Sequence, residues 1–387
     1  MTEWRECKLK DVCKYERISI NPQKYKILQF VHYSFPAFDN NKTPEIQFGG
    51  QIKSSKYIVK KGYILYNKLN VRFKRIWNIN FETPENSICS SEFLPILATK
   101  CNQDYLYYFL CSDELTDTMA NSNTGTSGSH QRIDPNFLMK YDILLPPLPE
   151  QKAIAEVLSS LDDKIDLLTR QNKTLEDLAQ AYFRKWFIED ASDKWEVVPI
   201  SEKFDVLLGG TPSRKIESYW TNGTIGWINS GKINEFRIIE ASEYITEEAL
   251  NNSSAKLLPA GTTVLAITGA TLGKISMVLR SFAANQSVIG LVPKAELSNN
   301  FIFLWLKENI NALISMQTGG AQQHINSNDV KSFDVIVPDT VALSLFRRKI
   351  DPLMLKISQN CFQINTLNKL RDTFLPKLIS GEIRVKM

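Results

Sequence analysis

The sequence contains three short stretches whose residue types could perform chemistry, and the first is GATLGK, from Gly269 to Lys274. A phosphate-binding loop has four residues between its glycines and a Ser or Thr after its lysine, which cradle the phosphates and bind magnesium. Here three residues separate the glycines, and Ile275 follows the lysine. The pattern therefore predicts a strand, a turn and a second strand, with Lys274 able to reach a polyanion.

The other two stretches contain carboxylates in patterns that resemble enzyme motifs. DPNF, from Asp134 to Phe137, approaches the tetrapeptide (Asp/Asn)-Pro-Pro-(Tyr/Phe) with which DNA adenine methyltransferases hold an extruded base. Asn136 replaces the second proline and no Gly-rich cofactor loop precedes it, so a turn before a strand is the better interpretation. DDK, from Asp162 to Lys164, resembles the core of a nuclease, but the outer positions of a heptad helix predict a solvated face.

No other catalytic set is visible. No Ser-His-Asp set or Cys-His pair stands at an informative spacing. The six cysteines include no CxxC pair and the chain has three histidines, so we expect reduced packing thiols and no zinc site. The sequence thus predicts a protein that is not an enzyme, with no catalytic residue, metal or cofactor in this chain.

Polar loops with side chains suited to base edges and phosphates remain. Asn and Gln pair with adenine edges, and Arg or Lys with guanine, in the major groove of DNA. The N-terminal candidates are Lys68, Asn70, Arg72, Lys74, Arg75, Thr126, Ser129, His130 and Arg132. The C-terminal candidates are Asn229, Ser230, Lys232, Thr268, Thr271, Lys274, Asn285, Gln286, Gln322, Gln323 and His324. Each alone could belong to an ordinary solvated loop; the hypothesis rests on their recurrence in both halves.

Two long helices must position these loops, because two heptad seams run through the chain with alternating steps of four and three. The first seam is Ile154, Leu158, Leu161, Ile165, Leu168, Asn172, Leu175, Ala179, Tyr182 and Trp186. The second is Phe346, Ile350, Leu353, Ile357, Asn360, Ile364, Leu367, Arg371, Phe374 and Leu378. The amide of Asn172 on the seam is expected to fix register at a cost in stability. Prolines 146, 147 and 149 predict an extended approach that ends where the first helix begins.

The seams belong to an internal repeat. YDILLPP from Tyr141 aligns with FDVIVPD from Phe333, and TGTSGSH from Thr124 aligns with TGGAQQH from Thr318. Between these aligned ends the two globular bodies share little sequence, and both alternate short β-rich runs with Gly, Asn, Ser and Pro turns. We predict an α+β fold with two mostly β domains, at 1–145 and 191–339, and helical regions at 146–190 and 340–387.

Composition limits the class of protein. A chain of 387 residues favours two or more domains, and 43% hydrophobic with 23% charged residues is typical of a folded globular protein. No run of about 18 apolar residues and no signal-peptide core are present, which predicts a cytoplasmic protein with no membrane partner. Lys and Arg outnumber Asp and Glu by 19 to 15 in 1–149 and by 9 to 3 in 341–387, which allows a polyanionic partner without demanding one.

The helix signature PPLPEQKAIAEVLSSLDDKIDLL and the stretches GGTPSRKIESYWTNGTIGWINSGKI, SSAKLLPAGTTVLAITGATLGK and NQSVIG resemble the specificity subunits of type I restriction-modification enzymes. The resemblance covers essentially the whole chain, and the second domain and helix signatures are the specific part. It implies two target-recognition domains separated by two antiparallel helices that act as a ruler, with each domain gripping one half of a split DNA target. Gly209 to Pro212 match the turn that opens the second domain, and Asn285 and Gln286 match its NQ element.

The resemblance also implies partners. Family members bind double-stranded DNA, two methyltransferase subunits that use S-adenosylmethionine, and two ATP-dependent motor-nuclease subunits that use magnesium. Pro352 departs from the helix pattern, and we expect it in the first turn of the second long helix with Asp351 as cap. Arg371 on the seam is a second departure.

Physical reasoning supports this picture. A helix of about 34 residues is roughly 50 Å long, which would hold two readers about one DNA turn apart. Because 191–340 carries 12 basic against 15 acidic residues, we expect weak DNA binding by the isolated chain. Alternatives are a specificity subunit of a methylation-only or type IIB-like system, a fused methyltransferase or nuclease, and a coiled-coil adaptor that does not contact DNA.

Overall fold

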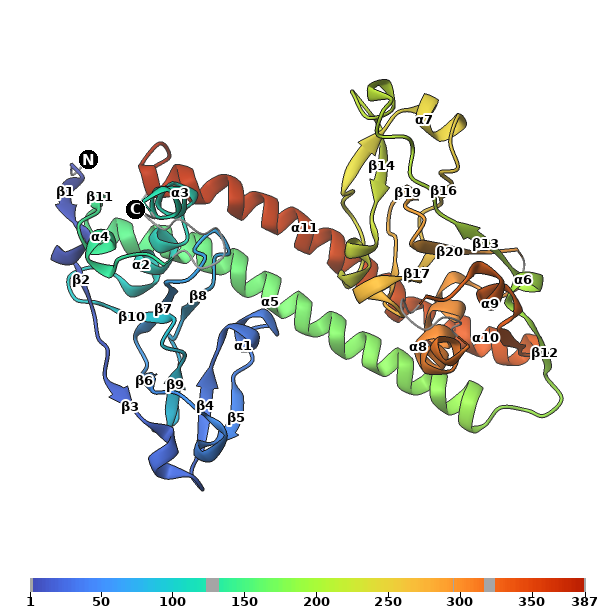
Figure 1. Cartoon of the computed structure of the whole chain (residues 1–387), viewed down its shortest axis with the longest axis horizontal. Helices are drawn as coiled ribbons and strands as arrows, with labels where there is room; N and C mark the ends of the chain where they lie inside the picture. Colours follow the sequence, from blue (N-terminus) through green and yellow to red (C-terminus); the bar gives the residue numbers. More distant parts are fainter. Residues whose placement is uncertain (1–2, 123–131, 295, 317–323, 386–387) are drawn as a thin grey trace. The chain divides into compact units, whose positions relative to one another are not determined.

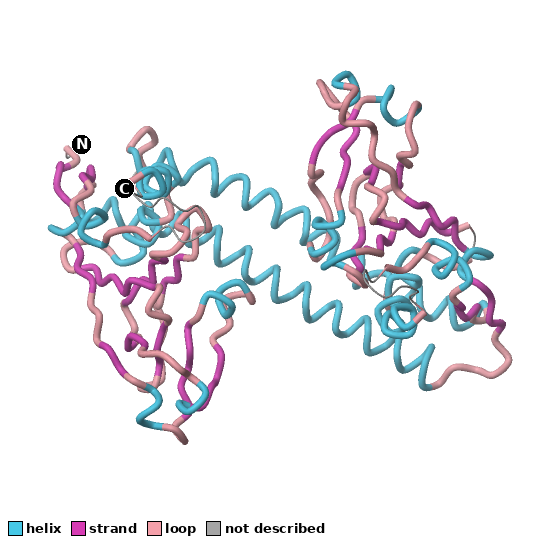
Figure 2. The backbone as a smooth tube through the Cα atoms, viewed as in Figure 1, coloured by secondary structure: helices cyan, strands magenta, loops and turns pink. Residues whose placement is uncertain are grey.

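The computed structural model describes residues 3–122, 132–294, 296–316 and 324–385. The chain forms two compact units: unit 1 comprises residues 1–163 and 367–387, and unit 2 comprises residues 164–366. Each unit therefore combines a globular body with one stretch of each of two long helices. Figures 1 and 2 show these elements along the chain.

Unit 1 contains three sheets. A two-stranded antiparallel sheet joins β1 (Arg5–Lys8) to β11 (Asp142–Leu145). A four-stranded sheet has the order β2 (Cys13–Tyr15), β10 (Phe93–Ala98), β7 (Tyr63–Asn67), β8 (Ile76–Asn78). A five-stranded sheet has the order β3 (Ser19–Ile20), β6 (Lys56–Ile58), β9 (Ser87–Cys89), β4 (Gln29–Tyr33), β5 (Glu45–Phe48), in which β4 and β9 are parallel.

Unit 2 repeats this topology. β12 (Glu196–Pro199) pairs with β21 (Asp334–Val337). A four-stranded sheet has the order β13 (Phe204–Leu208), β20 (Val288–Pro293), β17 (Thr263–Ala266), β18 (Ile275–Met277). Another has the order β15 (Glu243–Ile245), β14 (Ile225–Ile228), β19 (Phe282–Ala284), β16 (Leu257–Leu258), with β14 and β19 parallel. The repeat thus extends into the bodies whose sequences share little.

Short helices connect these strands. In unit 1 they are α1 (Phe35–Asp39), α2 (Gln103–Leu110), α3 (Asp113–Asn121), α4 (Pro135–Met139) and the 3-10 turns η1 (Leu9–Asp11), η2 (Pro22–Tyr25) and η3 (Gly49–Gln51). In unit 2 they are α6 (Ile200–Lys203), α7 (Glu247–Asn251), α8 (Asn299–Ser315), α9 (Ser327–Ser332), α10 (Thr340–Lys349) and the 3-10 turns η5 (Glu217–Tyr219), η6 (Ser230–Asn234) and η7 (Gly269–Thr271).

Two long helices carry the predicted seams. α5 spans Leu148–Arg184 and ends in a π-helical turn, Lys185–Glu189; α11 spans Asp351–Ser380. In unit 1 the stretches run antiparallel: Ile154 and Leu158 of α5 share one core with Leu378 of α11. In unit 2 they also run antiparallel, because Asn360 donates to Asn172 at 2.9 Å while Phe346, before α11, packs against Phe183. The α+β fold with antiparallel helices and an internal repeat is confirmed.

The ends of the helices differ from the sequence predictions in detail. α5 begins before Pro149, which lies in its first turn, where a missing N–H costs no hydrogen bond. Pro352 lies in the first turn of α11, as predicted, and the Asp351 carboxylate accepts a hydrogen bond from Asn300 at 2.9 Å. Pro376 lies inside α11, between the seam positions Phe374 and Leu378.

The first seam was wrong at its C-terminal end. Tyr182 is 38% exposed, whereas its neighbour Phe183 is fully buried. Trp186 is half-buried against the core in which Phe187 is buried. A straight helix of 3.6 residues per turn drifts against a 3.5-residue repeat, and the drift over these heptads moves the buried face by about one position. The remaining seam positions up to Ala179 are buried or half-buried, as are all those of the second seam.

Candidate nucleic-acid interface

Hydrogen bonds between loops bring most of the C-terminal candidates to one edge of unit 2. Asn285 N–H donates to Ile228 O, and Ile267 N–H donates to Ser287 O, both at 3.0 Å. Thr268 forms a β-bridge with His324. We define the loop edge of unit 2 by the segments joined in this way: residues 209–211, 229–232, 268–274, 285–287 and 324.

A glycine turn packs against the Asn285–Ser287 loop within this edge. Gly210 N–H donates to Ala284 O at 2.8 Å, and a Cβ atom at Gly209 would collide with the backbone oxygen of Asn285. Thr211 Oγ1 donates to Gln286 Oε1 at 2.5 Å, which fixes the orientation of that exposed amide. Only glycine permits this backbone approach, so the GGT turn and the NQ element form one rigid surface.

Some cationic and amide side chains of the loop edge of unit 2 already have partners within the unit, and others do not. Asn229 Oδ1 caps η6 by accepting from Gly231 N–H at 2.9 Å, and Lys232 pairs with Glu235 at 2.7 Å. Lys274 is exposed, and among the described residues it has no ion-pair partner. GATLGK lies between β17 and β18, and its η7 turn contacts η6, so the predicted strand, turn and strand are confirmed.

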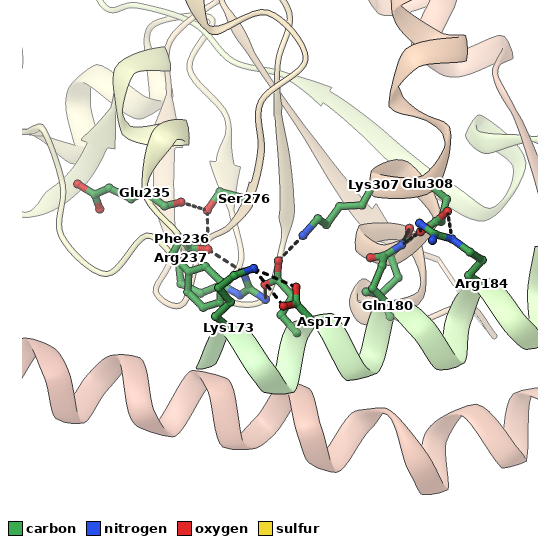
Figure 3. Close-up of polar contacts among 12 residues, drawn as sticks. Lys173, Asp177, Gln180, Arg184, Glu235, Phe236, Arg237, Ser276, Lys307 and Glu308 are labelled. Carbon is green, nitrogen blue, oxygen red and sulfur yellow. Dashed lines mark hydrogen bonds and ion pairs between the residues drawn. The ribbon is translucent and has the colours of Figure 1, made fainter. Parts of the chain in front are cut away.

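An ion pair with α5 anchors the loop that follows η6. Arg237, whose side chain is 1% exposed, pairs with Glu176 at 2.8 Å, and Lys307 also contacts this carboxylate. Ser276 Oγ donates to the backbone oxygen of Glu235 at 2.8 Å. Figure 3 shows Arg237 beside α5, while the Glu235 side chain extends away from this helix. Because η6 immediately precedes this anchor, α5 supports part of the loop edge of unit 2.

Unit 1 has the same hydrogen bonds at equivalent places. Ser90 N–H donates to Tyr33 O at 3.0 Å, and Lys68 N–H donates to Glu92 O at 2.8 Å. Leu69 forms a β-bridge with Arg132, as Thr268 does with His324. We define the loop edge of unit 1 by the equivalent segments, residues 34, 68–75, 90–92 and 132, together with Arg17, whose charge acts on Lys68. Ser34 and the Ser90–Glu92 loop are additions to the sequence-based candidates.

Carboxylates pair with three of the basic N-terminal candidates. Arg75 binds Asp39 through two hydrogen bonds of 2.8 Å, Arg132 binds Glu92 at 2.7 Å, and Lys74 binds Asp113. The Asp39 pKa is lowered chiefly by its hydrogen bond with the Arg75 guanidinium. Arg72 is exposed and, within the described residues, has no ion-pair partner.

The buried amide of Asn67 organises the basic loop. It is 1% exposed, donates to Leu69 O at 3.2 Å and to Phe73 O at 3.0 Å, and accepts from Arg75 N–H at 3.2 Å. Asn70 in this loop has the left-handed φ of 53°, which Asn tolerates better than most residues. Thr126, Ser129, His130, Gln322 and Gln323 lie outside the described residues, and their DNA contacts stay predictions.

Arg17 is the functional candidate that sequence reasoning missed. Its guanidinium lies 4.8 Å from the Tyr15 ring centroid, and Lys68 Nζ lies 6.0 Å from that of Tyr57. The Lys68 pKa is lowered by burial first and then by the charges of Arg17 and Arg132. Glu16 N–H donates to Pro95 O at the place where Leu207 pairs with Gly290 in unit 2, so Arg17 stands where unit 2 has Leu208.

Two of the carboxylate motifs have structural surroundings that differ from the predictions. Asp134 caps a five-residue helix, α4, by accepting from Asn136 N–H at 2.9 Å, so DPNF is not a simple turn. The prediction of a solvated Asp162 was wrong: it accepts from Tyr108 Oη at 2.9 Å and pairs with Arg371 at 2.9 Å. Arg371 on the second seam thus has its counter-charge on α5 within unit 1.

The described residues contain no His, Cys, Asp and Glu group able to hold a metal ion. The six cysteines are free, and burial raises the pKa of Cys13 and of Cys101 to about 12, which keeps these thiols protonated and unreactive. In the part of the chain that the structure describes, no helix combines the length and apolarity needed to cross a membrane. The described side chains of both loop edges offer hydrogen-bond donors, hydrogen-bond acceptors and positive charge.

Comparisons with known proteins address the whole chain. The sequence model of the family described as "Type I restriction modification DNA specificity domain" matches residues 1–177 and 192–342. The specificity subunit of the type I restriction enzyme HindI from Haemophilus influenzae is 22% identical and is covered completely, over 99% of this chain. The MjaIX specificity subunit from Methanocaldococcus jannaschii is 28% identical over 73% of this chain and 69% of that protein. A crystal structure of a type I S subunit from M. genitalium shares the fold with a TM-score of 0.60, 15% identity and coverage of 97% and 96%.

Proposed function

The chain belongs to the type I restriction modification DNA specificity family, and from this premise we propose that it reads a split, asymmetric DNA sequence. Each unit reads one half-site through its loop edge: Lys68, Arg72 and Arg17 in unit 1, and the Asn229, Lys274 and Gln286 region in unit 2. The recognition domains are residues 1–145 and 191–339. The other loop residues predicted from the sequence support these contacts or lie beside them.

The observation that supports this proposal most is the repeated backbone with different side chains. Equivalent hydrogen bonds hold both loop edges, yet the equivalent positions carry Ser34 and Asn229, Ser90 and Asn285, and Arg132 and His324. Sequence is read by the donors and acceptors of such side chains against base edges. Recognition of two different half-sites requires different side chains on the same backbone arrangement.

The partners and cofactors follow from the family. We propose that two methyltransferase subunits carry S-adenosylmethionine and methylate adenine, and that two motor-nuclease subunits carry ATP and magnesium. This chain supplies recognition without catalysis and acts in the cytoplasm. The two long helices determine the spacer between the half-sites; α5, with 37 residues, has a length of about 55 Å.

The test is to co-express the chain with the methyltransferase encoded beside it and to map methylated adenines by single-molecule sequencing. A split motif with two unlike halves is the expected result. Arg72→Ala and Lys274→Ala should each degrade one half of the motif and leave the other intact. A stable complex that binds a mixed-sequence duplex no better than the methyltransferase alone would instead support the adaptor interpretation.

A further inference from the structure

Unit 1 bears an exposed apolar apex at one end of its five-stranded sheet. Residues 25–28 form a turn in which Leu28 N–H donates to Tyr25 O at 3.0 Å, and Ile27 at its apex is 91% exposed. Leu28 and Phe48 beside it are 43% and 45% exposed. We call residues 22–28 and 48–51 the knuckle. Apolar side chains exposed together in this way mark an interaction surface more often than a single exposed one does, so the apex indicates a contact with a partner.

The knuckle is held rigidly. Gln23 Nε2 donates to the backbone oxygens of Gly50 and Ile52, both at 3.1 Å, and Gly50 N–H donates to Lys26 O at 3.1 Å. Gly49 N–H donates to Leu28 O at 2.8 Å, and a Cβ atom at Gly49 would collide with the Tyr25 oxygen. Ile27 is therefore presented on a braced turn, which reduces the ordering cost of inserting it into a partner.

The charge around the knuckle indicates the class of partner. Residues 17–81 carry 12 Lys and Arg against 2 Asp and Glu, whereas the equivalent residues 208–280 of unit 2 carry 7 against 6. One of the two acids, Asp39, already binds Arg75. Lys24 and Lys26 precede the apex, are exposed, and have no ion-pair partner among the residues the structure describes. An apolar apex next to two such cations on a basic body fits a polyanion with an apolar interior, which is duplex DNA.

We propose that Ile27 inserts between base pairs in the minor groove beside the half-site that unit 1 reads, while Lys24 and Lys26 contact the flanking phosphates. Minor-groove proteins use apolar wedges of this kind to unstack a base step and bend the duplex. This inference rests on the proposed function, and it adds a contact that deforms DNA without reading bases.

The geometry of β4 supports a minor-groove contact. The knuckle precedes β4, and the loop edge of unit 1 lies at its other end, where Tyr33 O accepts from Ser90 N–H. Five residues of strand span about 17 Å, which is roughly half of a 34 Å helical turn of DNA. In the proposed orientation β4 lies along the duplex axis and the loop edge of unit 1 lies in the major groove. The knuckle then lies over the minor groove, about five base pairs away.

The experiment uses the complex of the full chain with its methyltransferase and the methylated motif mapped above. 2-Aminopurine is placed at successive positions on both sides of the half-site that Arg72→Ala degrades, because its fluorescence rises when a base unstacks. We expect one bright step about half a turn from that half-site. Ile27→Ser should abolish this signal, weaken binding about tenfold and leave the motif unchanged. The matched control is Val341→Ser in unit 2, an aliphatic residue that is 78% exposed, which should change none of the three.

Ionic strength gives a second readout. Lys24→Gln with Lys26→Gln should reduce the slope of log K against log salt by about 1.8, because two phosphate contacts are lost. Lys349→Gln with Lys356→Gln, also exposed, is the control. The proposed insertion of Ile27 is wrong if the unsubstituted complex shows no position with raised 2-aminopurine fluorescence. It is also wrong if the lysine substitutions leave the slope of log K against log salt unchanged. If Ile27→Ser releases the methyltransferase, the knuckle is a protein-docking surface and the proposal is wrong. Absence of any sequence preference in the unsubstituted complex would instead refute the proposed function.

Discussion

The ion pair between Arg237 and Glu176 is the residue-scale feature on which the loop edge of unit 2 depends most. Their side chains are 1% and 9% exposed, so removing one partner leaves a charge that water cannot reach. Glu176→Ala should lower the free energy of unfolding by about 3 kcal/mol or more. We expect denaturant titration to show this loss, and methylation mapping to show a degraded half-site for unit 2 only.

The control is the exposed pair Arg214 and Glu243, whose side chains are 53% and 42% exposed. Breaking it with Glu243→Ala should cost only about 0–1 kcal/mol, because solvent screens the charges. Similar losses for the two variants would show that burial is not what makes the Arg237 pair important. Equal damage to both half-sites by Glu176→Ala would show that the pair does not act through its own loop edge.

His32 gives unit 1 a pH dependence of known sign. Its side chain is 9% exposed and its Nδ1 lies 3.0 Å from Gln47 Oε1. Burial lowers the pKa of His32; the hydrogen bond with Gln47 and the charge of Glu45 oppose this effect, and the charge of Lys56 adds to it. A lowered pKa means that the unfolded chain binds the proton first. Stability is therefore complete above the unfolded pKa of about 6.5 and falls as pH drops toward the folded value.

Denaturant titration between pH 7.5 and pH 5.5 should show this loss, and His32→Gln should flatten the profile. His324→Gln is the matched control because that ring is exposed in unit 2. A profile that keeps its slope in the His32 variant would assign the pH dependence to another group.

At the scale of elements, two adjacent aromatic residues of α5 differ in burial, and this difference defines the buried face of the helix. Phe183 is fully buried and packs against Phe301 with ring centroids 5.1 Å apart, whereas Tyr182 is 38% exposed. Phe183→Ala should lower the free energy of unfolding of unit 2 by about 3–5 kcal/mol. Tyr182→Ala should cost less than about 1 kcal/mol. The denaturant midpoints of the two variants measure these losses. A larger loss for Tyr182→Ala than for Phe183→Ala would show that Tyr182 is the seam residue, as the heptad pattern predicted.

Local pattern in the sequence was enough to predict both long helices and the seam up to Ala179, since burial at heptad spacing is a property of one helix. It was not enough beyond that point, where drift accumulates, nor for Asp162, whose partners Tyr108 and Arg371 come from distant elements. The two loop edges show the same limit of prediction from local sequence. Gly209 and Asn285 carry type-specific signals, but Arg17 and Ser90 acquire meaning only through hydrogen bonds between strands distant in sequence.

At the scale of the whole molecule, the two repeats share their backbone arrangement but differ in charge. The backbone frame is common to both units, while the charge is not, because residues 17–81 are strongly basic and 208–280 nearly neutral. Phosphate contacts supply most of the salt-dependent affinity of DNA-binding proteins. We therefore infer that unit 1 provides most of the electrostatic affinity, and that unit 2 contributes mainly base discrimination.

The proposed ruler would be a property of the whole molecule, and lengthening both long helices together tests it. Because Asn172 contacts Asn360 in an antiparallel pair, an insertion after Leu168 is matched by one after Gln363. Seven residues in each helix preserve the heptad phase and add about 10 Å, or about three base pairs of DNA. We expect methylation mapping to find unchanged half-sites with a spacer about three base pairs longer. Inserting the heptad in α5 alone is the control, and it should abolish methylation because the seams no longer match. Altered half-sites, or an unchanged spacer with the double insertion, would contradict the ruler, since a spacer determined by the partner subunits would not respond to these helices.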